Sequence, residues 1–173
     1  MRSLAALFFL TAMAMAQQTA KQEVPNNLAE HAAPTQPLPF SHKTHVGRGL
    51  PCRQCHANPE PGVQMTFPAT SVCMTCHANI ATDRPAIQKL ATFAKSGEAI
   101  PWVRVYRVTP GVTWTHRKHL DAGMQCVMCH GNVAALDAMA VTTAVTSMAS
   151  CISCHAEHKA GTTCQTCHAW PPA

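Results

Sequence analysis

The sequence predicts a mostly irregular fold with a few short α-helices and little or no sheet, and three observations lead to this class. Aromatic residues make up only 5% of the 173 residues and charged residues 12%, so few large side chains are at hand to build a core. Ten cysteines fall in short clusters along the chain. Only residues 83–95 or so carry a convincing helical pattern. We therefore expect something other than side chains to provide much of the buried bulk.

The first segment, residues 1–16, has the layout of a secretory signal peptide. Arg2 gives a positive start, Leu4 to Met15 forms a short apolar run, and Ala14-Met15-Ala16 is a small-x-small cleavage site. The run is too short to span a bilayer, and no stop-transfer pattern follows it. We expect an exported, periplasmic protein without a transmembrane segment in its mature chain.

Residues 17–39 follow as a linker rich in Gln, Ala and Pro, which is expected to be irregular or mobile. The formal net charge of the whole chain is +5, but no basic run is longer than Arg117-Lys118. Scattered cations of this kind are typical of a mildly basic surface, so we do not expect nucleic acid as a partner.

Every cysteine belongs to a Cys-x-x-Cys pair, and every pair is followed directly by histidine. The five motifs are Cys52-Cys55-His56, Cys73-Cys76-His77, Cys126-Cys129-His130, Cys151-Cys154-His155 and Cys164-Cys167-His168. A disulfide framework gives no reason for those histidines, and zinc sites combine two Cys pairs around one metal, which five pairs do not allow. Cys-x-x-Cys-His is the attachment sequence of c-type haem, in which both thiols bind the haem covalently and the histidine becomes an iron ligand. We predict five covalent haems and a haem-dominated core.

An internal repeat places further histidines ahead of two of the motifs. Residues 40–56 (FSHKTHVGRGLPCRQCH) align without a gap with residues 114–130 (WTHRKHLDAGMQCVMCH), 74 positions later. Six histidines lie outside the motifs, and five irons would each need a second axial ligand. The candidate distal ligands are His42, His45, His116, His119 and His158, with His31 in the linker as the spare.

The pattern aromatic-x-His-x-x-His followed by Cys-x-x-Cys-His resembles that of the class III multihaem cytochromes c, the small three- and four-haem electron carriers. This resemblance covers about residues 40–168. It implies that the first histidine of each pair ligates the haem attached just downstream and the second a later haem. His42 would then pair with His56, His45 with His77, His116 with His130, and His119 with His155. His158 is the expected partner of His168, and Met148 is the alternative ligand for one of the last haems.

A second resemblance concerns residues 100–119 (IPWVRVYRVTPGVTWTHRKH) with the two motifs after them. This stretch is similar to part of the pentahaem subunit of bacterial alternative complex III. The similarity implies other redox proteins as partners, including a membrane-bound quinol-oxidising or molybdenum-enzyme complex.

These patterns divide the chain into a two-haem module at 40–82, a connecting segment at 83–113 and a three-haem module at 114–173. In the connecting segment we expect a helix at about 83–95, capped by Thr82 or Asp83 and ended by Gly97. A weak alternation at 102–108 favours a short strand.

Two axial histidines would leave no iron position for a substrate, so the sequence favours an electron carrier rather than an enzyme. The alternative is a multihaem reductase with one open or displaceable ligand. A haem-based sensor or a structural assembly subunit is a third class, which would ordinarily need an attached signalling domain that the sequence does not show.

Overall fold

A computed structural model describes residues 20–169 of the chain except 30, 59–61 and 63, so the predicted signal peptide lies outside the described residues. The described helices are short: α2 (His42–Val46), α3 (Cys52–Cys55), α4 (Thr70–His77), α5 (Pro85–Ser96), α6 (His116–Asp121), α7 (Cys126–His130), the 3-10 turn η1 (Val133–Ala135), α8 (Met148–Glu157) and α9 (Cys164–Cys167). Within that part of the chain there is no strand, only two isolated β-bridges, Asn26 with Thr143 and Val112 with His168. The predicted fold class is confirmed.

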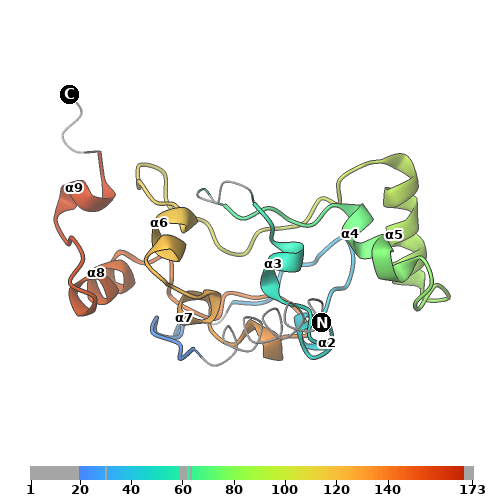
Figure 1. The fold of residues 1–173 in the computed structure, drawn as a ribbon, viewed down its shortest axis with the longest axis horizontal. Coiled ribbons are helices and arrows are strands. Elements are labelled where there is room, and N and C mark those ends of the chain that lie inside the picture. Colours follow the sequence, from blue (N-terminus) through green and yellow to red (C-terminus); the bar gives the residue numbers. More distant parts are fainter. Residues whose placement is uncertain (1–19, 30, 59–61, 63, 170–173) are drawn as a thin grey trace, which may run out of the picture.

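The molecule is elongated, with α4 and α5 at one end and α8 and α9 at the other (Figure 1). The remaining helices lie between these ends. This arrangement spreads the five cysteine motifs along the long axis instead of collecting them around one centre.

The largest cluster of buried apolar side chains lies at the α5 end. Leu38, Leu90 and Ile100 form it, and partly buried neighbours from α4 and α5, together with Trp102, pack around it. The only other described apolar side chain that is buried is Val24. Side chains alone therefore give this fold a small core, as the composition predicts.

Helix α5 confirms the helical prediction, with different details at its start. It spans Pro85–Ser96 with Pro85 in the first turn, and its N-cap residue is Arg84 rather than Thr82 or Asp83. Proline is favoured at that position because its missing N–H has no helical partner there. Gly97 ends the helix at φ 73°, a conformation that suits glycine.

The predicted strand at 102–108 is absent. The side-chain amide of Gln36 hydrogen-bonds both backbone groups of Val103 instead. It donates to the Val103 carbonyl and accepts from the Val103 N–H, both at 2.9 Å. A weak apolar alternation without a second strand to pair with leaves this segment extended but unpaired.

The linker is irregular over its described residues, as predicted, but it is held along the second repeat. The N–H groups of Glu23 and Val24 donate to the carbonyl of Met128 at 3.0 Å. Further on, Asn27 donates to Thr142 and Ala144 donates to Pro25. Residues 20–29 therefore form part of the folded structure around α7.

Candidate cofactor-binding sites

Each Cys-x-x-Cys pair lies within a helical turn. Helices α3, α7 and α9 begin at the first cysteine of their motifs, while α4 and α8 begin three residues earlier. Residues three apart are neighbours on a helix surface, so both sulfurs of a pair face the same side, with the histidine directly after them. All ten cysteines carry free thiols in the structure, and none is in a disulfide.

The two repeats build the same aromatic arrangement around their distal histidines. Phe40 meets His42 edge-on, with ring centroids 4.9 Å apart, and stacks on His45 at 4.4 Å. Trp114 meets His116 edge-on at 4.3 Å and stacks on His119 at 5.2 Å. The aromatic residue two positions before the first histidine therefore fixes the orientation of both imidazoles.

Capping residues fix the backbone of the same repeats. The hydroxyls of Ser41 and Thr115 accept hydrogen bonds from Thr44 and Lys118 at the starts of α2 and α6. After the helices, Gly49 and Gly123 take φ values of 85° and 87°, a region that disfavours residues with a Cβ. The chain can then turn back to bring each motif close to the histidines.

The structure brings eight candidate histidines together in four pairs. The ring centroids are 6.5 Å apart for His42 and His56, 6.2 Å for His45 and His77, 6.4 Å for His116 and His130, and 6.1 Å for His119 and His155. The first and third pairs are nearly parallel, at 11° and 18°, whereas the second and fourth are inclined at 63° and 41°. Each pair joins one motif histidine to one histidine from α2 or α6.

In six of these eight imidazoles a backbone carbonyl occupies Nδ1, so Nε2 is the nitrogen left to bind a metal. Nδ1 bonds a backbone carbonyl in six cases: His45 to Ser41 (2.8 Å), His56 to Thr66 (2.9 Å), His77 to Ile80 (3.0 Å), His116 to Gly62 (2.9 Å), His119 to Thr115 (2.9 Å) and His155 to Gly161 (2.6 Å). A carbonyl only accepts, so Nδ1 carries the proton and the lone pair lies on Nε2. This is the tautomer found in metal-ligating histidines.

Burial keeps several of the imidazoles neutral. It is the main cause that lowers the pKa of His42 to about 4, with smaller contributions from His56 and His45. It also lowers the pKa of His130 to about 4, aided by His116 and His56. The pKa of His116 is lowered as well, mainly by burial, although its bond to Gly62 opposes the shift. A neutral imidazole is the form that binds a metal.

The spacing of the pairs fits two imidazoles bound on opposite sides of one metal ion. A metal–imidazole bond is about 2 Å long, and roughly 1 Å more from nitrogen to ring centre on each side gives about 6 Å between centroids. The observed separations of 6.1–6.5 Å agree with this value. Two thiols lie beside each pair, so the donor set fits c-type haem.

A surface hollow of about 420 Å³ lies beside the first of these sites. His56 lines it together with Arg53 and Arg117. Two guanidinium groups next to a motif histidine are well suited to carboxylates such as haem propionates.

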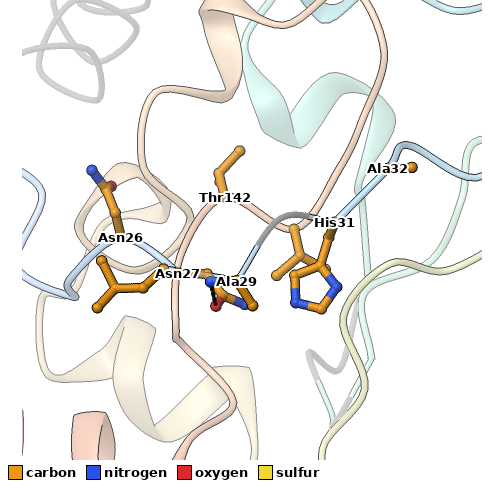
Figure 2. A pocket seen from close by; sticks show the side chains of 8 residues that line it. Asn26, Asn27, Ala29, His31, Ala32 and Thr142 are labelled. Carbon is orange, nitrogen blue, oxygen red and sulfur yellow. Dashed lines mark hydrogen bonds between the residues drawn. The ribbon is translucent and has the colours of Figure 1, made fainter.

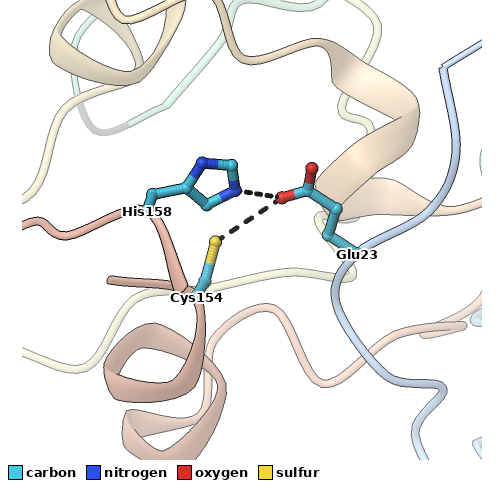
Figure 3. Close-up of side chains that lie close together, drawn as sticks. All are labelled: Glu23, Cys154 and His158. Carbon is cyan, nitrogen blue, oxygen red and sulfur yellow. Dashed lines mark hydrogen bonds and ion pairs between the residues drawn. The ribbon is translucent and has the colours of Figure 1, made fainter. Parts of the chain in front are cut away.

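The fifth motif differs from the other four. His158 donates from Nε2 to the carboxylate of Glu23 at 2.7 Å, and the Cys154 thiol also approaches that carboxylate at 3.8 Å (Figure 3). Among the described ring contacts His158 does not meet His168, whose Nδ1 lies 3.4 Å from the carbonyl of Gly111. Met148, the alternative ligand, is 68% exposed at the start of α8. The prediction that His158 serves His168 stays a prediction.

The spare histidine lies in a different place. His31 lines a second hollow of about 660 Å³, formed by the linker residues 26–29, 31 and 32 and by Val141 and Thr142 (Figure 2). No motif cysteine lines this hollow. The position of His31 is consistent with its interpretation as the histidine left over.

Sequence reasoning missed two residues around the motifs. Glu23 lies in the linker, where composition indicated no structural role. Tyr106, the only tyrosine of the chain, lies with its ring 5.2 Å from His130 and accepts from the backbone N–H groups of Thr142 and Thr143 at 2.8 and 3.0 Å. A lone tyrosine outside any motif gives no sequence signal for this role.

Two family models match the chain. The model of the class III cytochrome c family matches residues 16–100, and that of cytochrome c7 and related cytochromes c matches residues 112–169. Curated proteins give no match. None of the described helices is long and apolar enough to cross a membrane.

Proposed function

Because this chain belongs to the class III multihaem cytochrome c family and is a multihaem electron-transfer protein, we propose that it is an exported carrier of five covalent c-type haems. Four of the irons are held between two histidines. The four histidine pairs at 6.1–6.5 Å carry this proposal.

The cysteines and histidines at each site have different binding roles. The two cysteines of a motif would hold the haem through thioether bonds, and the motif histidine would be one ligand of its iron. The second ligand would come from His42, His45, His116 or His119, in the pairings given above. When bound, the haem supplies one-electron chemistry at its iron.

Two imidazoles on one iron exclude substrate from the metal. The Nδ1 bonds to backbone carbonyls hold the rings in place and increase the basicity of Nε2, which favours low to moderate reduction potentials. Stacking on Phe40 and Trp114 adds rigidity to the distal side. Such sites exchange electrons and do not bind a reactant.

The partners that follow from this function are other exported or membrane-bound redox proteins. The resemblance of residues 100–119 to part of the pentahaem subunit of alternative complex III supports a quinol-oxidising or molybdenum-enzyme complex among them. The signal-like residues 1–16 support a periplasmic location.

One observation favours a second candidate function, a reductase with an open iron at the fifth motif. In the described arrangement Nε2 of His158 carries a proton donated to Glu23, so this nitrogen has no lone pair for a metal. An iron ligated by His168 alone would have a free position for a small oxyanion or a similar reactant.

A single sample tests both functions. The mass of the mature protein, matured together with the haem-attachment machinery, counts the haems, and the reduced optical spectrum is recorded with and without carbon monoxide. We expect five haems, with at least four-fifths of the absorbance unaffected by carbon monoxide. A change worth one-fifth would place an open iron in the protein and favour the reductase, whereas a change over most of the absorbance would contradict histidine pairing.

A matched substitution locates any carbon monoxide response. His168→Ala removes the motif histidine at the fifth site, and His31→Ala is the control from the second hollow. If the fifth iron is the open one, His168→Ala alters the carbon monoxide response and His31→Ala leaves it unchanged. A response unchanged in both variants would place the open iron at another motif.

A further inference from the structure

The five Cys-x-x-Cys-His motifs, numbered 1 to 5 along the chain, are not arranged in space as they are arranged in the sequence. The first contact joins motif 2 to motif 1 through α2. His42 of this helix pairs with His56 of motif 1, and His45 of the same helix pairs with His77 of motif 2. Motif 2 lies on α4, which packs against α5 at one end of the molecule (Figure 1). Motif 2 therefore has motif 1 on one side and α5 on another.

The second contact joins motif 1 to motif 3, across the two repeats. His56 of motif 1 lines one hollow together with Arg117 and Leu120 of α6, the helix whose His116 pairs with His130 of motif 3. Helix α2, whose His42 pairs with His56, also packs against η1 just after motif 3. The two repeats thus meet at their first motifs, although 74 residues separate them in sequence.

The third contact joins motif 3 to motif 4 through the linker. Helix α6 also joins them, because its His116 and His119 pair with the histidines of motifs 3 and 4. Glu23 connects the same two motifs, since its N–H donates to Met128 in α7 and its carboxylate accepts from Cys154 in α8. This explains why residues 20–29 are folded against the second repeat.

The last contact joins motif 4 to motif 5. Nδ1 of His155 in motif 4 lies 2.6 Å from the carbonyl of Gly161, three residues before Cys164 of motif 5. The carbonyl of Cys167 accepts from Thr113 at 2.7 Å, and His168 forms an isolated bridge with Val112. Motif 5 is therefore fixed beyond motif 4, at the end of the molecule that α9 occupies (Figure 1).

From these contacts we infer that the five haem sites form a single row in the order 2–1–3–4–5, with motifs 2 and 5 as the two terminal sites where partners exchange electrons. This inference rests on the proposed function, because it needs a haem at each motif. One electron moves at each step, so that one iron is oxidised as its neighbour is reduced and no covalent bond changes. Of the three exposed motif cysteines, Cys76 and Cys164 belong to the terminal motifs.

The order has a functional consequence that the sequence order would not give. Motif 1 is the only site next to motif 2, so electrons from motif 2 reach the rest of the molecule through motif 1 alone. In a 1–2–3–4–5 order, motif 2 would instead be the link between motif 1 and motif 3.

Proton–proton Overhauser contacts between haem substituents test the order in the native holoprotein. We expect contacts between the haems of motifs 1 and 2, 1 and 3, 3 and 4, and 4 and 5. Contacts between the haems of motifs 2 and 3 without any between motifs 1 and 3 would overturn the inference. The haem count from the mass of the same sample is the separate readout for the proposed function, so the two failures are distinguishable.

Two matched variants test the consequence for electron flow. Cys52→Ala/Cys55→Ala removes the attachment at motif 1, and Cys73→Ala/Cys76→Ala removes it at motif 2. Both variants are followed by nuclear magnetic resonance during a redox titration. Loss of motif 1 should stop fast electron exchange between the haem of motif 2 and the other three haems. Loss of motif 2 should leave all four remaining haems in fast electron exchange. The opposite pattern would overturn the inference. If the motif 1 variant does not mature, the Overhauser contacts of the native protein decide.

Discussion

Residues 40–56 and residues 114–130 hold two versions of one local structure. In both, a hydroxyl caps a short helix, an aromatic ring orients two histidines, and a glycine with positive φ turns the chain toward the motif. In both, the first histidine lies parallel to the motif histidine of the same repeat and the second is inclined to that of the next motif. The local sequence therefore determines the pairing geometry.

The surroundings of the two versions differ. Nδ1 of His116 donates to Gly62, whereas Nδ1 of His42 is buried without a partner among the described residues. The first cysteine is exposed in motif 1 and half-buried in motif 3. Tyr106 and the linker pack around motif 3. The comparison shows that tertiary contacts, which the repeat does not encode, make the second version the centre of the molecule.

The largest expected difference between the repeats concerns loss of a whole motif. Cys126→Ala/Cys129→Ala should prevent accumulation of folded holoprotein, while Cys52→Ala/Cys55→Ala should yield a four-haem protein. Removing the central site should disrupt its contacts with the linker and with Tyr106. We expect the free energy of unfolding to fall by about 5 kcal/mol, which is comparable with the whole stability of a small domain. Haem content by mass and thermal unfolding measure both. Equal yields of the two variants would contradict a central position for motif 3.

The next largest effect separates the distal ligands. His42→Ala and His116→Ala should each open one iron, so that each adds about one-fifth of the absorbance to the carbon monoxide-sensitive fraction. His116→Ala should also be the less stable variant by about 1 kcal/mol, because only His116 makes the hydrogen bond to Gly62. Carbon monoxide difference spectra and denaturant unfolding give the two readouts. An unchanged spectrum in either variant would remove that histidine from the ligand set.

A smaller effect is expected from the aromatic residues. Phe40→Leu and Trp114→Leu each remove stacking on the second histidine of their repeat, which should destabilise the protein by about 1 kcal/mol. Thermal unfolding measures the loss, with Phe67→Leu as a control that contacts His56 but neither distal histidine. If the control lost as much as the two variants, stacking on the distal histidines would not be the cause.

The smallest effect is expected at the helix caps. Ser41→Ala and Thr115→Ala each remove an N-cap hydrogen bond, which costs about 0.5–1 kcal/mol in a short helix. The loss should be larger for Ser41, whose hydroxyl also donates to Asp137 at 2.8 Å. Denaturant midpoints compare the two variants with Ser41→Thr, which retains the cap. A Ser41→Thr variant as unstable as Ser41→Ala would contradict a capping role.

Much of this protein could be predicted from its sequence because the chemistry is local. The motifs, the irregular fold and the helix ended by Gly97 all depend on residues close together in the chain. The spatial order of the motifs could not be predicted, because it depends on long-range contacts such as the packing of α2 against η1. Glu23 was missed for the same reason, since its partner His158 lies far along the chain. The alternation at 102–108 gave a wrong strand because the side chain of Gln36 took the place of a second strand.

The electron paramagnetic resonance spectrum of the fully oxidised holoprotein tests the histidine pairs most directly. Two parallel imidazoles on one iron increase the energy gap between two of its d orbitals. Two inclined imidazoles decrease that gap. The nearly parallel pairs at motifs 1 and 3 and the inclined pairs at motifs 2 and 4 therefore predict two classes of low-spin signal, the second with the larger anisotropy. High-spin signals from more than one iron in five would contradict the account.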